Sequence, residues 1–269
     1  MFNVIKMYLY RMKRSKIMYL LPVIAIVFCL VEELITYYTM KEMGLDYVNL
    51  PGNIPLDGIT GVDLLPIILT FVTMMIVPTM CILFSMAFLN GDMQSGYAKN
   101  IIGYTGNRKK QAVAEIVIPF LFTVGLIIVC VIVTFGVGLI LFKKPEFKNV
   151  GKFFLTLLVM LMELMAFLMI IKWFADATGK YVLAMILGAV YALYSMLIYE
   201  LIDIIVNWNS ENPFDGFKIE KYTLLGGMVA NNTNSDGKDF ALSAGIAIVV
   251  FIVFFFLDVK AMEKRELKA

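Results

Sequence analysis

Few residues of this chain have the types and spacing that catalysis requires. The sequence contains no histidine, which excludes His-dependent metal sites, Ser-His-Asp triads and Cys-His dyads. Cys29, Cys81 and Cys130 all lie in apolar stretches and form no CxxC pair, so we interpret them as small buried side chains. A GxxxxGK[ST] phosphate-binding loop is also missing, because residues 237–239 lack its glycine spacing and its hydroxyl residue. We therefore expect no catalytic site and no cofactor in this chain.

Charged side chains within apolar stretches are the remaining candidates for chemistry. Glu163 lies near the middle of one such stretch, and Thr156 shares its helix face. A carboxylate at the centre of a membrane span costs roughly 2.5–3.5 kcal/mol, so it should face protein or a watery cavity. Glu163 is then part of a translocation path, a contact between two copies, or a hydrogen-bonded core carboxylate. Lys172 and Asp176, four residues apart, predict a modest helix pair of about 0.2–0.5 kcal/mol and nothing more.

The elements that must position these residues are long apolar helices. Of the 269 residues, 61% are hydrophobic and 16% are charged, whereas a soluble domain is about 45–50% apolar and about 25% charged. Several uncharged stretches exceed the roughly 18 residues that indicate a membrane span. We predict an all-α integral membrane protein with one transmembrane domain over residues 1–269. The six predicted spans are Ile17–Tyr37, Leu64–Leu89, Ala112–Phe142, Phe153–Phe174, Tyr181–Val206 and Phe240–Leu257.

The basic residues predict the orientation of these spans. Fifteen of the 23 lysines and arginines fall in the N-terminal segment, the second and fourth connections and the C-terminal tail. Short loops rich in Lys and Arg stay in the cytoplasm, so both termini should be cytoplasmic. The connection with Lys143, Lys144, Lys148 and Lys152 disagrees, because it would lie outside. The net charge of +2 gives no indication of a nucleic-acid partner.

The first sixteen residues predict an amphipathic helix on the membrane surface. On a helix, one face would carry the apolar side chains of Phe2, Ile5, Tyr8, Leu9 and Met12. The rest of its surface would carry Lys6, Arg11, Lys13 and Arg14. Such a helix binds the anionic cytoplasmic leaflet before the chain enters the bilayer. An ordinary positively charged anchor is a compatible alternative.

The connection over residues 90–110 is too long for a turn, because helix–helix connections usually take about 2–8 residues. Residues 93–102 could form about three helical turns, with Tyr97, Ile101 and Tyr104 in one apolar stripe. Gly103 and Gly106 would end this helix. An apolar stripe beside basic residues predicts a docking surface for a partner; the alternative is that the stripe packs under the bundle.

The same connection carries a resemblance to a known family. Phe88, Asp92, Gly96, Lys99, Asn100 and Arg108 follow one another in the order Phe-x3-Asp-x3-Gly-x2-Lys-Asn-x7-Arg. This order and the six-span plan resemble the permease subunits of type-2 ABC exporters, most closely the short permeases of bacterial peptide-antibiotic export and immunity systems. The resemblance implies that this connection is a coupling helix that contacts a separate ATPase. Asp92 stands where Glu is commoner, and Glu115 stands where Lys is frequent.

The resemblance also implies partners and cargo. ATP and Mg would be bound by a P-loop ATPase subunit, in two copies, and a second permease copy or a sibling would complete the pathway. The cargo would be an amphipathic or antimicrobial peptide, leaving a bacterial cytoplasmic membrane. A stand-alone secondary transporter and a structural membrane subunit are the alternatives. An intramembrane protease based on Glu32 and Glu33 is excluded, because those metal-dependent enzymes need histidine.

The outer loop over residues 207–239 is too long to be only a connector. It contains an apolar stretch, Tyr222–Ala230, with Gly226 and Gly227 side by side. This composition fits a re-entrant or interfacial hairpin at the outer end of the bundle, and similar exporters carry short re-entrant helices there. An ordinary loop is the alternative.

Overall fold

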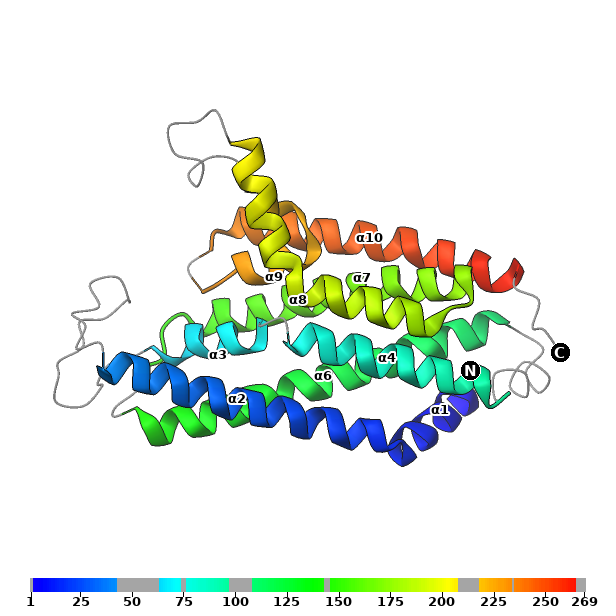
Figure 1. Ribbon diagram of the computed structural model, residues 1–269, viewed down its shortest axis with the longest axis horizontal. Helices are drawn as coiled ribbons and strands as arrows, with labels where there is room; N and C mark the ends of the chain where they lie inside the picture. Colours follow the sequence, from blue (N-terminus) through cyan, green and yellow to red (C-terminus); the bar gives the residue numbers. More distant parts are fainter. Residues whose placement is uncertain are drawn as a thin grey trace.

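The computed structural model describes residues 2–42, 63–73, 76–96, 108–142, 146–207, 218–233 and 235–264, and these residues are almost entirely helical (Figure 1). The elements are α1 (Phe2–Arg14), α2 (Lys16–Glu42), α3 (Leu64–Thr73), α4 (Ile76–Gln94), α6 (Arg108–Leu141), α7 (Val150–Thr178), α8 (Tyr181–Val206), η1 (Ile219–Tyr222), α9 (Leu224–Ala230) and α10 (Gly237–Lys264). Within the described residues, the only extended pairing is an isolated bridge between Asp63 and Glu146.

Six of these helices, α2, α4, α6, α7, α8 and α10, are long and apolar enough to cross a membrane. The predicted all-α membrane protein is thereby confirmed. The second predicted span, Leu64–Leu89, is divided into α3 and α4. Pro66 and Pro78 each lie in the first turn of one of these helices, where the missing N–H costs no helical hydrogen bond. The predicted span thus corresponds to α3 followed by the membrane-length helix α4.

The long helices alternate in direction, so their ends gather at two ends of the bundle. The start of α1, the end of α4, the start of α6 and the end of α10 all lie at one end, which we call the terminus end (Figure 1). The end of α2 and the start of α3 lie at the opposite end. The chain thus begins and leaves its last described helix on the same side.

At the terminus end, α1 is a separate helix that turns into α2 at Ser15, whose N–H donates to the Met12 carbonyl over 3.0 Å. Val4, Tyr8 and Met12 recur every four residues on its buried face, which packs against α6 and α2. Ile5 and Leu9 are partly buried against the same core. The predicted amphipathic helix is therefore present, with its apolar face on the bundle.

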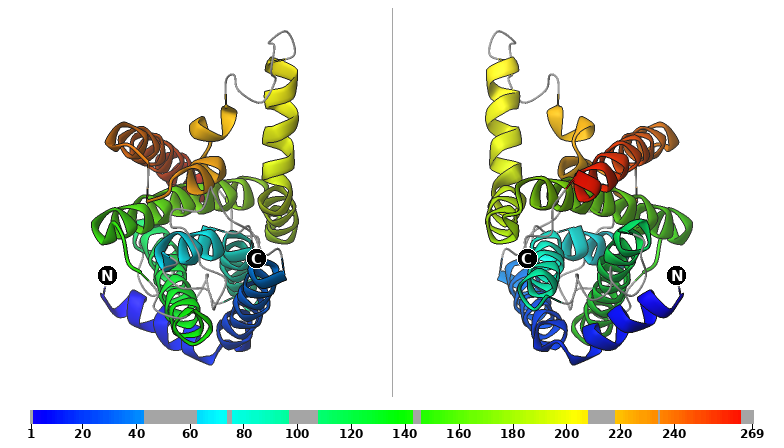
Figure 2. Two further views of the ribbon diagram at one scale, coloured as in Figure 1. Left: turned by 90° about the vertical axis from the view of Figure 1, so that its left-hand side faces the viewer. Right: turned by 90° about the vertical axis from the view of Figure 1, so that its right-hand side faces the viewer.

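Small residues let α8 pack closely on α4. Ala184, Gly188 and Ala192 are spaced four residues apart and are buried. A Cβ added at Gly188 would lie 3.2 Å from Ile82 of α4 and 3.1 Å from Ile171 of α7. Such small-residue faces allow helix backbones to approach in membranes. The Ser195 hydroxyl on the same helix donates to the Ala192 carbonyl. The final part of α8 projects away from the other helices (Figure 2).

The opposite end of the bundle is held by polar contacts between connections. Asp63 Oδ1 accepts the N–H groups of Leu65 and Lys148 over 3.2 and 3.3 Å. The ammonium of Lys148 lies 2.7 Å from Glu146, which raises the pKa of this lysine, and Lys152 Nζ donates to the Ser235 carbonyl over 3.1 Å. Two of the four lysines in the basic connection thus have partners here; Lys143 and Lys144 lie outside the described residues.

Candidate functional site: a buried charge cluster

Three helices bring four charged side chains together inside the terminus end. Lys172 and Asp176 lie one turn apart near the end of α7, Glu115 lies two turns into α6, and Asp258 lies in the last two turns of α10. Because these helices alternate in direction, residues far apart in the sequence reach the same depth of the bundle. We call Glu115, Lys172, Asp176 and Asp258 the charge cluster.

The Lys172 ammonium is the centre of the charge cluster. Its Nζ lies 2.6 Å from Asp176 Oδ2, 2.7 Å from Asp258 Oδ2 and 3.2 Å from Glu115 Oε2. An ammonium has three donor hydrogens, so one is available to each carboxylate. All four residues are at most 3% exposed. Inside a protein such pairs are strongly interdependent, because removal of one partner leaves an uncompensated buried charge.

Neutral donors extend the charge cluster to two further helices. Gln111 Nε2 donates to Glu115 Oε1 over 2.7 Å, and the Tyr8 hydroxyl of α1 donates to the same oxygen over 3.4 Å. The hydroxyl of Tyr181, the first residue of α8, donates to Asp176 Oδ1. The network therefore connects α1, α6, α7, α8 and α10 through side chains alone.

The expectation that Lys172 and Asp176 form a modest helix pair and nothing more is wrong. The pair exists, but it is buried and shares its lysine with Glu115 and Asp258. The predicted last span stopped at Leu257, one residue before Asp258, whereas α10 continues to Lys264. Asp258 therefore lay outside every predicted span, and its contact with Lys172 was not predicted.

A second ion pair connects α1 to the end of α4. The Arg11 guanidinium pairs with the buried carboxylate of Asp92 and lies over the Phe88 ring, 5.4 Å from its centroid. Asp92, predicted to take part in coupling, is therefore covered by α1. Gly96 ends the described part of this segment with a φ of 68°, a left-handed conformation that glycine adopts without steric cost.

Of the remaining residues predicted to contact an ATPase, the structure describes only one. Arg108 is the first residue of α6. Tyr97, Lys99, Ile101 and Tyr104 lie outside the described residues. In the sequence, the segment that contains them follows α4 and precedes α6.

A protein-family model matches residues 23–268 of the chain and is described as "Protein of unknown function (DUF2705)". The chain belongs to the DUF2705 family. No curated protein matches the sequence. The part of the chain matched to DUF2705 begins within α2, so it contains all four residues of the charge cluster but neither Tyr8 nor Arg11 of α1.

Glu163 of this DUF2705 chain lies in the middle of α7 and is 1% exposed. The Ser243 hydroxyl of α10 hydrogen-bonds its carboxylate, and Asn231 Nδ2 donates to that hydroxyl over 2.8 Å. A Cβ at Gly227 of α9 would clash with Glu163 Oε1, so glycine permits α9 to cover it. Glu163 is thus hydrogen-bonded and covered within the described residues; a part in translocation or in contact between two copies stays a prediction.

The other residues around Glu163 are also enclosed. Thr156, predicted beside it, is buried and donates to the Lys152 carbonyl of its own helix over 2.9 Å. Leu224, Leu225 and Met228 of α9 are buried against the bundle. The apolar stretch in the outer loop is therefore a short helix that packs on α7; its depth in a membrane stays a prediction.

Glu33 carries another buried carboxylate, and from the sequence it was considered only as a pair with Glu32. It is fully buried on α2, and a Cβ at Gly138 of α6 would lie 3.2 Å from its Oε1. Among the described residues, neither of its oxygens has a hydrogen-bond partner. An ionisable residue buried within a membrane span is by default a candidate functional residue.

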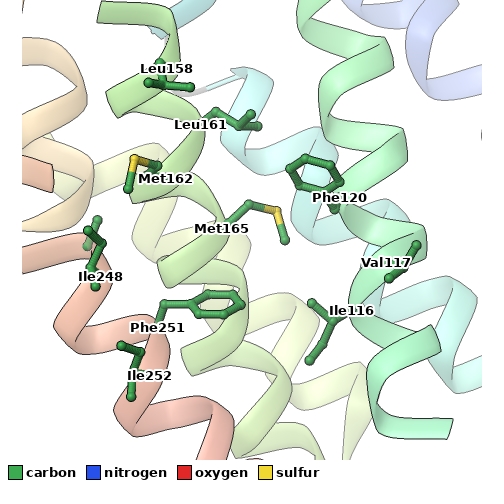
Figure 3. Close-up of a pocket in the computed structure, with 11 residues that line it drawn as sticks. Ile116, Val117, Phe120, Leu158, Leu161, Met162, Met165, Ile248, Phe251 and Ile252 are labelled. Carbon is green, nitrogen blue, oxygen red and sulfur yellow. The ribbon is translucent and has the colours of Figure 1, made fainter. Parts of the chain in front are cut away.

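An apolar groove of about 490 Å³ lies between α6, α7 and α10 (Figure 3). In the figure, the side chains of Phe120, Met165 and Phe251 point toward one another across it. The groove is lined by Ile116, Val117, Phe120, Leu158, Leu161, Met162, Met165, Ala247, Ile248, Phe251 and Ile252. A separate small cavity shares Ile116 and Met165 with this groove and is also lined by Glu115 and Lys172 of the charge cluster.

Proposed function

We propose that the chain is the membrane-spanning permease subunit of an ABC exporter that moves amphipathic or antimicrobial peptides out of the cell, powered by a separate ATPase. The observation that carries the proposal is the end of α4. Asp92 pairs with Arg11 of α1, α4 ends at Gln94, and Gly96 follows with a left-handed backbone conformation. A connection anchored in this way can transmit the movement of a docked partner to α1 and α4.

The proposed assembly follows from the same resemblance. Two P-loop ATPase subunits that bind ATP and Mg would dock on the terminus end, and a second permease copy or a sibling would complete the pathway. The terminus end would face the cytoplasm of a bacterium, with α1 on the anionic membrane surface. The apolar groove lined by flexible Met162 and Met165 is suited to varied amphipathic cargo.

Co-purification with the products of neighbouring genes tests this proposal. We expect a P-loop ATPase to purify with the wild-type chain in mild detergent and to be lost from a Tyr97→Asp, Ile101→Asp variant. A matched control, Val150→Asp with Tyr222→Asp, adds the same two charges at exposed positions of the opposite end and should retain the ATPase. Purification of the wild-type chain alone would overturn the ABC proposal.

A stand-alone secondary transporter is the second candidate, favoured by one specific observation. Glu33, Glu163 and the charge cluster are buried ionisable groups within spans, and such groups form proton relays in transporters. If this candidate holds, the chain alone in proteoliposomes will drive peptide movement in response to a pH gradient without ATP. Transport only with an added ATPase would exclude it.

A further inference from the structure

Glu33 lies at the end of a buried stripe on α2, the helix that packs against α6. The stripe recurs every four residues and consists of Leu21, Ala25, Cys29 and Glu33. On α6, a second buried stripe with the same spacing consists of Cys130, Thr134 and Gly138. Residues four apart share one helix face, and small side chains on such a face let two helices approach closely in a membrane.

Gly138 leaves the space that the Glu33 carboxyl group needs. A Cβ added to Gly138 would lie 3.2 Å from Glu33 Oε1 and 3.1 Å from both terminal methyl carbons of Leu64, the first residue of α3. These separations are shorter than the roughly 3.5–4.0 Å of ordinary contacts between carbon atoms. The fully buried carboxyl group of Glu33 is therefore enclosed by the backbone of α6 and an apolar side chain of α3.

The described residues provide no hydrogen-bond donor for this carboxyl group. Neither oxygen of Glu33 has a hydrogen-bond partner among them. The hydroxyl of Thr134, on the buried face of α6, donates instead to the carbonyls of Cys130 and Val131 in its own helix. An ionised carboxylate in such surroundings is strongly unfavourable, and a buried group of this kind becomes neutral instead.

The helices around this part of α2 bring no charge to Glu33 either. Within the described residues, α6 carries no charged residue between Glu115 and its end, α3 carries none, and α4 carries none before Asp92. Asp92 and Glu115 belong to the terminus end and have partners there, whereas Glu33 lies toward the opposite end of α2. The titratable groups that remain on these helices are the buried thiols of Cys29, Cys81 and Cys130.

Two further carboxylates are neighbours of Glu33 along the chain or across the bundle. Asp63, directly before α3, accepts the N–H groups of Leu65 and Lys148. Glu32 precedes Glu33 on α2 and is partly exposed. Neither supplies the positive charge that an ionised Glu33 would need.

We propose that Glu33 is a proton-binding site, which holds a proton while α2 packs on α6 and releases it to water when this interface opens. The neutral acid is the form that the apolar enclosure accommodates. A metal cation does not fit, because it requires several oxygen ligands, and the atoms beside Gly138 include the methyl groups of Leu64. The described residues also form no cluster of three or more metal-ligating side chains. This proposal is independent of whether the chain serves an ATPase or transports alone.

Infrared difference spectroscopy of the purified chain in detergent detects the proton directly. At neutral pH the wild type should show a carboxylic-acid C=O band that Glu33→Gln lacks. Glu32→Gln, a matched change at the neighbouring and partly exposed carboxylate, should retain the band. If the wild type and Glu33→Gln differ only in the ionised carboxylate bands, Glu33 carries no proton and the proposal fails.

Transfer of the wild type to heavy water tests the link between the proton and the helix interface. The acid band of Glu33 should shift slowly, at a rate comparable with exchange of the buried amides of α2 and α6, because the proton leaves only when these helices separate. An immediate shift would show that water reaches Glu33 without opening of the interface, and would overturn this link.

Thermal unfolding at different pH values measures the same proton through stability. The folded chain keeps a proton on Glu33 that the unfolded chain releases near the ordinary pKa of a glutamate, about 4.3. Because the folded state binds the extra proton, the folded-to-unfolded ratio of the wild type relative to Glu33→Gln should fall by up to about tenfold per pH unit above that value. The ratio of the wild type relative to Glu32→Gln should show no such trend. A constant difference between the wild type and Glu33→Gln would contradict the proposal.

The same unfolding experiment distinguishes a proton from other occupants of the site. Glutamine has the size of a protonated glutamate, so Glu33→Gln should fold and should unfold at the wild-type temperature or above it at neutral pH. Failure of Glu33→Gln to fold would show that the site requires a charge. Stabilisation of the wild type, but not of Glu33→Gln, by Na⁺ or K⁺ at constant ionic strength would show that a cation is bound. Either result overturns the proposal.

Discussion

At the scale of single residues, Lys172 holds the charge cluster together. Its ammonium is the one cation within the described part of this network, and three carboxylates from three helices approach it within 3.2 Å. A buried ion pair contributes little net stability when it is compared with a well-packed apolar pair, but the loss of one partner is costly. Lys172 is thus more important for keeping α6, α7 and α10 in register than for the total stability of the fold.

We therefore predict that Lys172→Met destabilises the chain severely. The substitution leaves three carboxylates without a cation, and the expected loss is about 3–5 kcal/mol in the free energy of unfolding. Thermal unfolding in detergent, followed by size-exclusion chromatography, measures the change. Lys180→Met removes an exposed lysine at the start of α8 and should change stability by less than about 0.5 kcal/mol. Similar losses in both variants would contradict the central position of Lys172.

The sequence predicts individual charged residues better than it predicts their partners. Glu163 was identified from its position in the middle of an apolar stretch, and burial confirms that it faces protein. Asp258 was missed because the predicted last span ended one residue before it, at Leu257, whereas α10 continues to Lys264. Which carboxylates meet Lys172 depends on the rotation of α6 and α10 about their axes, and helical periodicity in one chain segment does not determine contacts with another.

At the scale of elements, α1 is attached to the bundle at two polar points. Arg11 pairs with Asp92 at the end of α4, and Tyr8 donates to Glu115 of α6. A helix that only rested on the lipid surface would not need these contacts. The amphipathic pattern predicted the helix, but its buried stripe of Val4, Tyr8 and Met12 shows that the bundle covers part of the face expected to meet lipid.

Arg11→Gln should release α1 from α4. The substitution removes the charge that pairs with Asp92 and the cation over Phe88, and a hydrogen bond to a charged group contributes about 1.5–3 kcal/mol. Hydrogen exchange of the amides of α1 should therefore become on the order of tenfold faster or more. Arg14→Gln is the matched control, because Arg14 is exposed and lies over the Tyr10 ring. Unchanged exchange in Arg11→Gln would show that apolar packing alone holds α1.

The sequence also predicts the existence of the long helices better than it predicts where each helix begins and ends. Length and apolar composition identified the regions of all six long helices, and the bounds of Tyr181–Val206 agree with those of α8. The division of Leu64–Leu89 into α3 and α4 was not predicted, although both contain a proline in the first turn. Prolines are tolerated within membrane helices, so their position alone did not distinguish one interrupted span from two helices.

At the scale of the whole molecule, the chain combines a polar interior at the terminus end with apolar outer faces. Helices α2, α8 and α10 expose many large apolar side chains, including Leu34, Leu201 and Phe256. A soluble protein rarely exposes contiguous apolar surface of this kind, whereas lipid or a second membrane subunit covers it readily. The carboxylates of Glu33, Glu163 and the charge cluster are buried inside the bundle, as the cost of charge in a bilayer requires.

The orientation of this arrangement is the last prediction, and it follows from the placement of basic residues. We expect the terminus end to face the cytoplasm, because most lysines and arginines of short loops belong to it. A membrane-impermeant maleimide on intact cells should label Lys221→Cys, exposed at the opposite end, and not Ser95→Cys, exposed at the terminus end; permeabilised cells should label both. The wild type is the control, since Cys29, Cys81 and Cys130 are buried. Labelling of Ser95→Cys alone would reverse the orientation, and an ATPase in the cytoplasm could not then reach the connection between α4 and α6.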